Sequence, residues 1–194
     1  MNDADQAVVL QIVDAARKYF LRFGYSRVST EEIARSIGRS KKTLYKHFET
    51  KEALLHAVLA RVDSEAQREI TDLLADRTGD RLVRLRGILT AVAVHMASTH
   101  QVLLADLRIS SPELGQQAWR EQRIALALLL TPVLREASDE HVVRSDLATD
   151  KVLEIFFSCV EGMATPLDVA QNAQSPGEIF SPLVSLMVDG LRAR

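Results

Sequence analysis

The chain has 194 residues, of which 47% are hydrophobic and 26% charged, and its formal net charge is −2 at pH 7. This composition can bury a core in one domain or two, and it excludes a protein that is basic over its whole surface. The low glycine and proline content and the absence of sustained polar–apolar alternation predict an all-α fold. The sequence has neither a run of about 18 apolar residues nor a secretory signal, so we expect a cytoplasmic protein with no membrane partner.

The first predicted helix covers residues 6–23, and two short helices with their own N-terminal caps follow it. Ser29 can cap the first short helix, and Glu32, three residues later, completes a capping box. Gly38 supplies the left-handed residue that ends this helix, and Ser40 can cap the next one. The pattern predicts a helix-turn-helix, in which the second short helix fits a DNA major groove.

The region around this second helix is basic. Ten cations and three anions lie between Ala15 and Lys51, so this segment carries +7 and the rest of the chain −9. Basic, hydroxyl and aromatic side chains here can donate to phosphates or read base edges. Alternatively the cations are only solvated, and Tyr45 is a half-buried core aromatic. The predicted DNA contacts are Thr30, Arg39, Ser40, Lys41, Lys42, Thr43, Tyr45, Lys46, His47 and Lys51.

Three sequence runs in this region resemble the DNA-binding domain of the tetracycline-repressor (TetR) family of bacterial regulators. They are Glu-Glu-Ile-Ala at 31–34, Ser-Lys-Lys-Thr-Leu-Tyr-Lys-His-Phe at 40–48 and Thr-Lys-Glu-Ala-Leu at 50–54. The resemblance covers roughly the first 55 residues. It implies that the predicted contacts around the second short helix bind operator DNA.

Three positions depart from the family's pattern. A small apolar residue is usual where Arg39 stands, glycine is common at the position of Lys42, and proline often replaces Glu49. The two basic departures bear on operator sequence and affinity. The resemblance implies a helix-turn-helix domain over residues 1–50 and a C-terminal helical bundle, for effector binding and dimerisation, over residues 51–194.

The rest of the chain is predicted to be helical. A long helix capped by Thr50 is the mechanical link between the two domains. Pro132 is expected to kink the helix that contains it. Turn residues separate five further predicted helices, at 80–98, 100–109, 112–137, 149–165 and 176–192.

The C-terminal domain has more apolar material than dimerisation alone needs. We therefore expect a mainly apolar effector cavity, on the order of 300 to 1,000 Å³, bordered by the helices at 80–98, 112–137 and 149–165. Each candidate contact can equally be ordinary core, and the sole cysteine can be a buried hydrophobe or a redox sensor. The candidate effector contacts are His95, Met96, His100, Trp119, Phe156 and Cys159.

The last two predicted helices are apolar on nearly all sides, so both sides must be covered. A second copy of the chain can supply the outer cover, or another helix of the same chain can do so. The family resemblance implies a symmetric four-helix dimer interface, which suits a palindromic operator. The predicted interface residues are Leu153, Phe157, Val160, Ile179, Leu183 and Met187.

The sequence offers no recognisable catalytic or metal-binding pattern. His95 and His100 are five residues apart and diverge around a helix, and there is no Cys-x-x-Cys pair or glycine-rich phosphate loop. We therefore expect no enzyme activity, metal or cofactor. The resemblance implies a homodimeric repressor that a small apolar or amphipathic effector releases from a palindromic operator. The alternatives are a ligand-independent DNA-binding or nucleoid-associated protein and, more remotely, a small helical enzyme or carrier.

Overall fold

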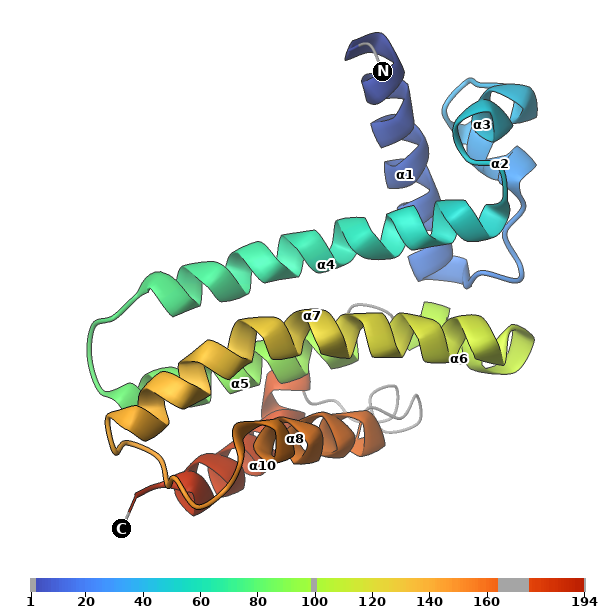
Figure 1. The fold of residues 1–194 in the computed structure, drawn as a ribbon. Coiled ribbons are helices and arrows are strands. Elements are labelled where there is room, and N and C mark those ends of the chain that lie inside the picture. Colours follow the sequence, from blue (N-terminus) through green and yellow to red (C-terminus); the bar gives the residue numbers. More distant parts are fainter. Residues whose placement is uncertain (1–2, 99–100, 164–174, 194) are drawn as a thin grey trace. The chain divides into compact units, whose positions relative to one another are not determined.

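The computed structural model describes residues 3–98, 101–163 and 175–193, and the regular structure in these ranges is α-helical (Figure 1). An isolated bridge joins Val143 to Arg192. The predicted all-α fold is confirmed. The helices are α1 (Asp3–Phe23), α2 (Thr30–Ser36), α3 (Lys41–His47), α4 (Lys51–Ala75), α5 (Arg81–Ser98), α6 (Gln101–Ser110), α7 (Pro112–Asp139), α8 (Thr149–Met163) and α10 (Pro176–Leu191).

The contacts divide the chain into two compact units. The first, which we call the head, comprises Met1–Glu65 and His100–Trp119, and the second, the body, comprises Ala66–Thr99 and Arg120–Arg194. This division differs from the boundary expected at residue 50. The first half of α4 and all of α6 belong with the head because their apolar side chains complete its core.

Local hydrogen bonds set the ends of the short helices in the head. The Ser29 hydroxyl accepts from the Glu32 amide at 3.2 Å, and the Glu32 carboxylate accepts from the Ser29 amide at 2.8 Å. Gly38 has φ +66°, and the Ser40 hydroxyl accepts from the Thr43 amide at 3.1 Å. The predicted capping box, the left-handed glycine and the second cap are confirmed.

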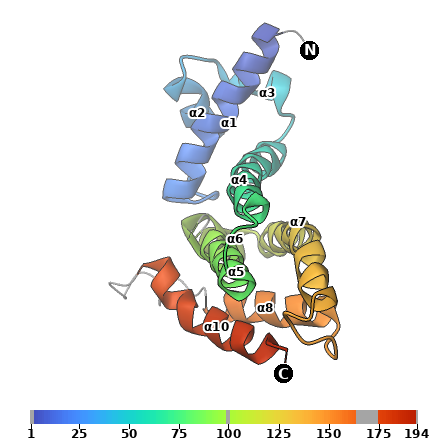
Figure 2. The same ribbon diagram turned by 90° about the vertical axis from the view of Figure 1, so that its left-hand side faces the viewer.

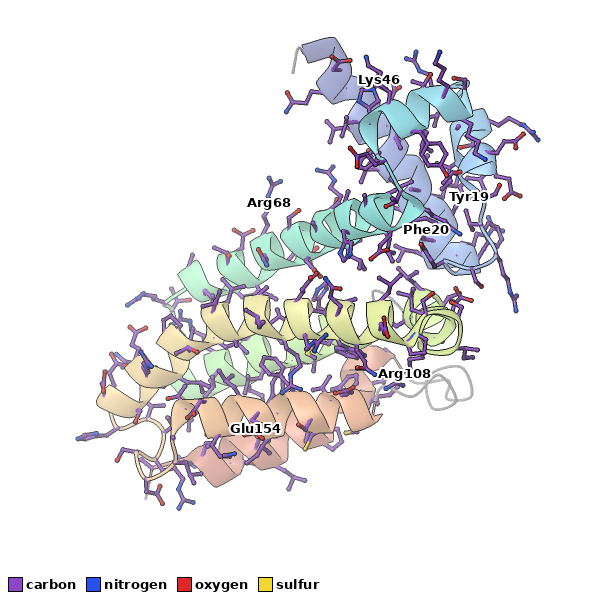
Figure 3. The ribbon with its side chains drawn as sticks, turned by 45° about the vertical axis from the view of Figure 1, so that its right-hand side comes forward. Tyr19, Phe20, Lys46, Arg68, Arg108 and Glu154 are labelled. Carbon is purple, nitrogen blue, oxygen red and sulfur yellow. The ribbon has the colours of Figure 1, made fainter. Side chains whose placement is uncertain are left out.

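The head core draws on helices that are far apart in the sequence. Leu103 and Leu107 of α6 are fully buried beside residues of α1 to α4. Phe20, labelled in Figure 3, is also fully buried and contributes the largest side chain. The other buried members of this core are Ile12, Val13, Ala16, Val28, Ile33, Ala34, Leu44, Leu54, Leu55, Val58, Leu59 and Ala118.

In the body, α5 packs against α8 and α10, which lie beside one another below it in Figure 2. The side chains of Leu85, Leu89, Phe180 and Val184 are buried there. Helix α7 continues through Pro132 and changes direction in its second half (Figure 2), where proline removes a backbone hydrogen-bond donor. The body is therefore stabilised mainly by apolar packing.

Candidate nucleic-acid interface

Helix α3 is anchored by one side chain and exposes the others. Leu44 is fully buried in the head core. Lys41, Lys42 and Lys46 are exposed around it, and Figure 3 shows Lys46 projecting from α3. Arg39 precedes the helix and is exposed too. A seven-residue helix with one apolar anchor thus presents a basic face to solvent.

The hydroxyl groups among the predicted DNA contacts form hydrogen bonds within the head, and these bonds hold α2 and α3 in place. Thr30 is 6% exposed, and its hydroxyl lies 3.2 Å from that of Tyr45, which is 37% exposed. The Ser40 and Thr43 hydroxyls are 2.9 Å apart. Thr30 was expected to be exposed to DNA, but it is buried. The reason is that Ile33, one turn later on the same face of α2, packs in the core. The Thr30 hydroxyl therefore positions Tyr45.

The cations of this surface differ in how much other side chains engage them. The Lys41 ammonium lies 5.8 Å from the centre of the Tyr45 ring, and the Lys46 ammonium lies 3.6 Å from the Asp5 carboxylate. Arg39 and Lys42 are exposed and form no ion pair with any residue the structure describes. Arg39 and Lys42, the two basic departures from the family pattern, are therefore the cations most available to phosphates.

Lys51 points into the head instead of outward. Its ammonium donates to the Tyr25 carbonyl at 2.6 Å and lies 4.3 Å from the centre of the Tyr25 ring. Burial lowers the pKa of Lys51, and the negative charges of Asp106 and Glu32 oppose this shift. Sequence reasoning missed this brace because its partner lies 26 residues earlier.

The chain is similar in sequence to known proteins. Residues 12–58 match the model of bacterial regulatory proteins of the tetR family. The HTH-type transcriptional repressor Rv1474c of Mycobacterium tuberculosis is 30% identical over 166 residues, which cover 84% of each chain. The chain belongs to the TetR family. It is therefore a helix-turn-helix transcriptional regulator, and its helix-turn-helix lies in the head.

Solved TetR-family structures extend the likeness to the whole fold. FadR of Bacillus subtilis, solved with stearoyl-CoA, has a TM-score of 0.72 at 20% identity and covers 94% of this chain and 99% of its own. KstR2 of Mycobacterium tuberculosis, a ketosteroid transcriptional regulator, has a TM-score of 0.61 at 18% identity, with coverage of 100% and 97%. At these identities the likeness shows the fold alone.

In the TetR-family body, three of the predicted dimer residues lie inside the chain's own core. Leu153, Phe157 and Val160 are each less than 5% exposed. Helix α8 is apolar on two sides, and the side that carries these three residues faces the interior of the body. Its outward side carries Ile155, which is 48% exposed, and α10 carries Leu186, which is 75% exposed. The predicted α10 residues Ile179, Leu183 and Met187 are half-buried.

The predicted effector contacts do not form one lining. Met96 and Phe156 are fully buried in the body, and Cys159 is half-buried on α8. The ring nitrogen Nε2 of His95 lies 3.4 Å from Nε2 of Gln122, a buried residue that the sequence reasoning did not single out. Trp119 falls in the head unit, and His100 lies outside the described residues.

A pocket in the body is bordered by two of the three expected helices, α5 and α7, but not by α8. Its volume is about 70 Å³, smaller than the expected cavity, and none of the six candidate residues lines it. Two ion pairs border it, Arg77 with Glu136 at 2.9 Å and Arg81 with Glu140. The side chains of Met96 and Phe156 are fully buried in the interior of the body. The larger effector cavity stays a prediction.

The described residues also bear on membrane insertion and metal binding. None of the described helices is long and apolar enough to cross a membrane. No group of three His, Cys, Asp or Glu side chains within the described ranges could hold a metal ion.

Proposed function

We propose that this TetR-family protein is a repressor that binds a palindromic operator as a homodimer and leaves it when a small molecule enters the body. The exposed basic face of α3 carries the proposal, because a short helix with one buried anchor and exposed cations fits a major groove. Rv1474c, similar over most of the chain, is named a repressor.

The apolar outer surface of α8 and α10 supports the dimer. Both helices pack on α5, so their opposite faces point away from it. A second copy offers the same two-helix surface, and two-fold pairing of such surfaces yields a closed dimer. Two heads related by one axis then match the two halves of a palindrome. This outer stripe consists of Ile155, Cys159 and Met163 on α8 with Ile179, Leu183, Leu186 and Met187 on α10.

A pair of polar side chains inside the largely apolar body supports the proposed effector site. Gln122 of α7 is 5% exposed and lies beside His95 of α5. Polar groups in such a setting can orient the head group of an amphipathic ligand while Met96 and Phe156 move aside for its apolar part. The solved relatives include one with stearoyl-CoA and a ketosteroid regulator. The effector must bind the DNA-incompetent state more tightly, because equal affinity would shift nothing.

The DNA-binding step is tested with a duplex that the wild-type protein selects from a randomised library. Replacing Arg39 and Lys42 together by alanine should weaken binding and lower the salt slope by about 0.9 for each phosphate that the protein no longer neutralises. Arg68 and Arg135, which are exposed, provide a charge-matched control pair outside the head. Failure to select any sequence, or equal salt slopes for both double variants, would overturn the assignment.

The effector step is tested with a panel of fatty acyl-CoAs and sterols. A true effector should raise the melting temperature and weaken operator binding by a coupling of about 1 to 3 kcal/mol. Gln122→Leu should reduce the effect of an amphipathic effector while leaving operator binding in its absence unchanged. If no compound alters operator affinity, the ligand-independent alternative replaces this proposal.

A further inference from the structure

The turn between α1 and α2 is held by a carboxylate that comes 80 residues later in the chain. Asp106 of α6 accepts from the Ser26 amide through Oδ2 at 2.6 Å and from the Ser26 hydroxyl through Oδ1 at 2.5 Å. Both carboxylate oxygens are therefore used on one residue of the turn. Hydrogen bonds to a charged acceptor are stronger than those between neutral groups.

The turn also leaves no room between itself and α6. Gly24 has φ +87°, and a Cβ atom there would lie 2.8 Å from the Cβ and Cγ atoms of Asp106. Such an approach is shorter than van der Waals contact, so glycine is required for both its backbone conformation and its size. Leu103 and Leu107 fix α6 from its apolar side, since both are fully buried in the head core.

A second helix holds the same turn at the intervening residue. Lys51 of α4 donates to the carbonyl of Tyr25, which lies between Gly24 and Ser26. Its ammonium is also attracted by the negative charge of Asp106. Three successive turn residues are thus fixed by side chains or steric contact from α4 and α6.

This turn lies just before the start of α2. Three residues after Ser26, Ser29 forms the capping box that opens the helix. The next residue, Thr30, bonds the Tyr45 hydroxyl of α3. A shift at Ser26 would therefore reach α3 through one short helix, because α2 and α3 pack directly on each other.

We propose that Asp106 is a positioning residue for DNA binding, which sets the placement of α2 and α3 through Ser26. The residue acts from α6, which belongs to the head. This inference rests on the proposed DNA-binding function and adds a residue that does not itself touch DNA.

The test compares variants at both ends of the contact on the duplex selected by the wild-type protein. Asp106→Ala should weaken operator binding about tenfold. Ser26→Ala should weaken it less, because the backbone bond remains, and Ser26→Thr should restore it by returning the hydroxyl. Once Asp106 is alanine, adding Ser26→Ala should cost nothing more, since the two residues share one interaction.

A matched control lies in the body. Asp76 accepts from the Thr78 amide at 2.9 Å and from the Thr78 hydroxyl at 2.6 Å, the same pair of groups that Asp106 engages on Ser26. Asp76→Ala therefore removes an equivalent bond pair and should leave operator affinity unchanged. Amide hydrogen exchange should show Ser26 opening faster in Asp106→Ala while Leu44, in the head core, keeps its protection.

The possible results separate this inference from the proposed function. If the wild-type protein selects no duplex, DNA binding itself fails. If it selects one and Asp106→Ala binds within about twofold of wild type, the positioning role is overturned while DNA binding stands. The role is equally overturned if Ser26→Thr binds as weakly as Ser26→Ala, or if Asp76→Ala loses as much affinity as Asp106→Ala.

Discussion

The head and the body fix their helices in different ways. In the head, polar side chains close the helix ends and the turn, as at Ser29, Ser40 and Asp106. In the body, α5, α8 and α10 pack through apolar faces such as those of Phe156 and Phe180, and one surface ion pair, Arg86 with Asp189 at 2.9 Å, joins α5 to α10. A unit with polar fixed points can keep a small surface in one geometry for DNA. A unit held by apolar packing can repack around a ligand or a second copy.

The largest effect is expected at the outer face of the body. Ile155→Glu or Leu186→Glu would place an unpaired charge in the proposed dimer interface, at a cost of several kcal/mol, and should dissociate the dimer. Sedimentation equilibrium at micromolar concentration measures this directly. Phe157→Glu is unsuitable because Phe157 lies in the protomer's own core, where the charge would unfold the chain.

Val83→Glu is the matched control for these variants. Val83 is 68% exposed on α5 and lies outside the stripe formed by α8 and α10. It should leave the dimer intact. A dimer that survives both Ile155→Glu and Leu186→Glu would show that the apolar stripe is not the dimer interface. The proposed role of the body in dimerisation would then be wrong.

Equivalent cavities in the two units should cost similar stability but differ in function. Leu44 of α3 and Leu89 of α5 are both buried, and truncating either to alanine should cost about 2 to 5 kcal/mol in unfolding free energy. Below the melting temperature of both variants, Leu44→Ala should also weaken operator binding because it removes the only full anchor of α3. Urea denaturation and operator titration check the two parts, and equal operator affinity would contradict the second.

The head could be predicted from its sequence because its signals are local. Ser29 with Glu32, Ser40 and Gly38 each act within three or four residues, so spacing alone identifies them. Residue spacing within a helix does not predict polar contacts between segments that are far apart in the sequence. Asp106 meets Ser26 across 80 residues, and no periodic pattern within α6 distinguishes it from an ordinary exposed acid.

The body was less predictable because α8 is apolar on two sides. Helical spacing groups Leu153 with Phe157 and Val160, but it does not tell which group faces the same chain. The structure turns that group inward and leaves Ile155 outside. The existence and bounds of the helix were predictable, whereas its rotation depends on α5 and α10, which only the folded chain brings beside it.

The two capping boxes provide a finer comparison, since the same motif occurs once in each unit. Ser29 with Glu32 opens α2, and Ser175 with Glu178 opens α10. Replacing either serine by alanine should cost about 1 kcal/mol of stability. Only Ser29→Ala should also weaken operator binding, because α2 positions α3. Thermal unfolding and operator titration of both variants, followed by restoration with Ser→Asp, test this, and equal losses of affinity would contradict it.

The smallest effect is expected where an acidic side chain meets the basic face of the head. Asp5 of α1 lies 3.6 Å from Lys46, and both side chains are substantially exposed. An exposed pair of this kind contributes about 0.2 to 1 kcal/mol. Asp5→Asn should therefore strengthen operator binding by a factor of about 1.4 to 5, because Lys46 is released and a negative charge is removed from beside the phosphates.

The sign of this change decides between two roles for Asp5. If Asp5 competes with phosphate for Lys46, affinity rises in Asp5→Asn and the gain shrinks as salt screens the charges. If Asp5 instead orients Lys46 toward the groove, affinity falls. Asp150→Asn, an exposed position at the start of α8, makes the same charge change in the body and should leave binding unchanged. A fall in affinity would place Asp5 with Thr30 among the polar side chains that hold the head in its DNA-binding geometry.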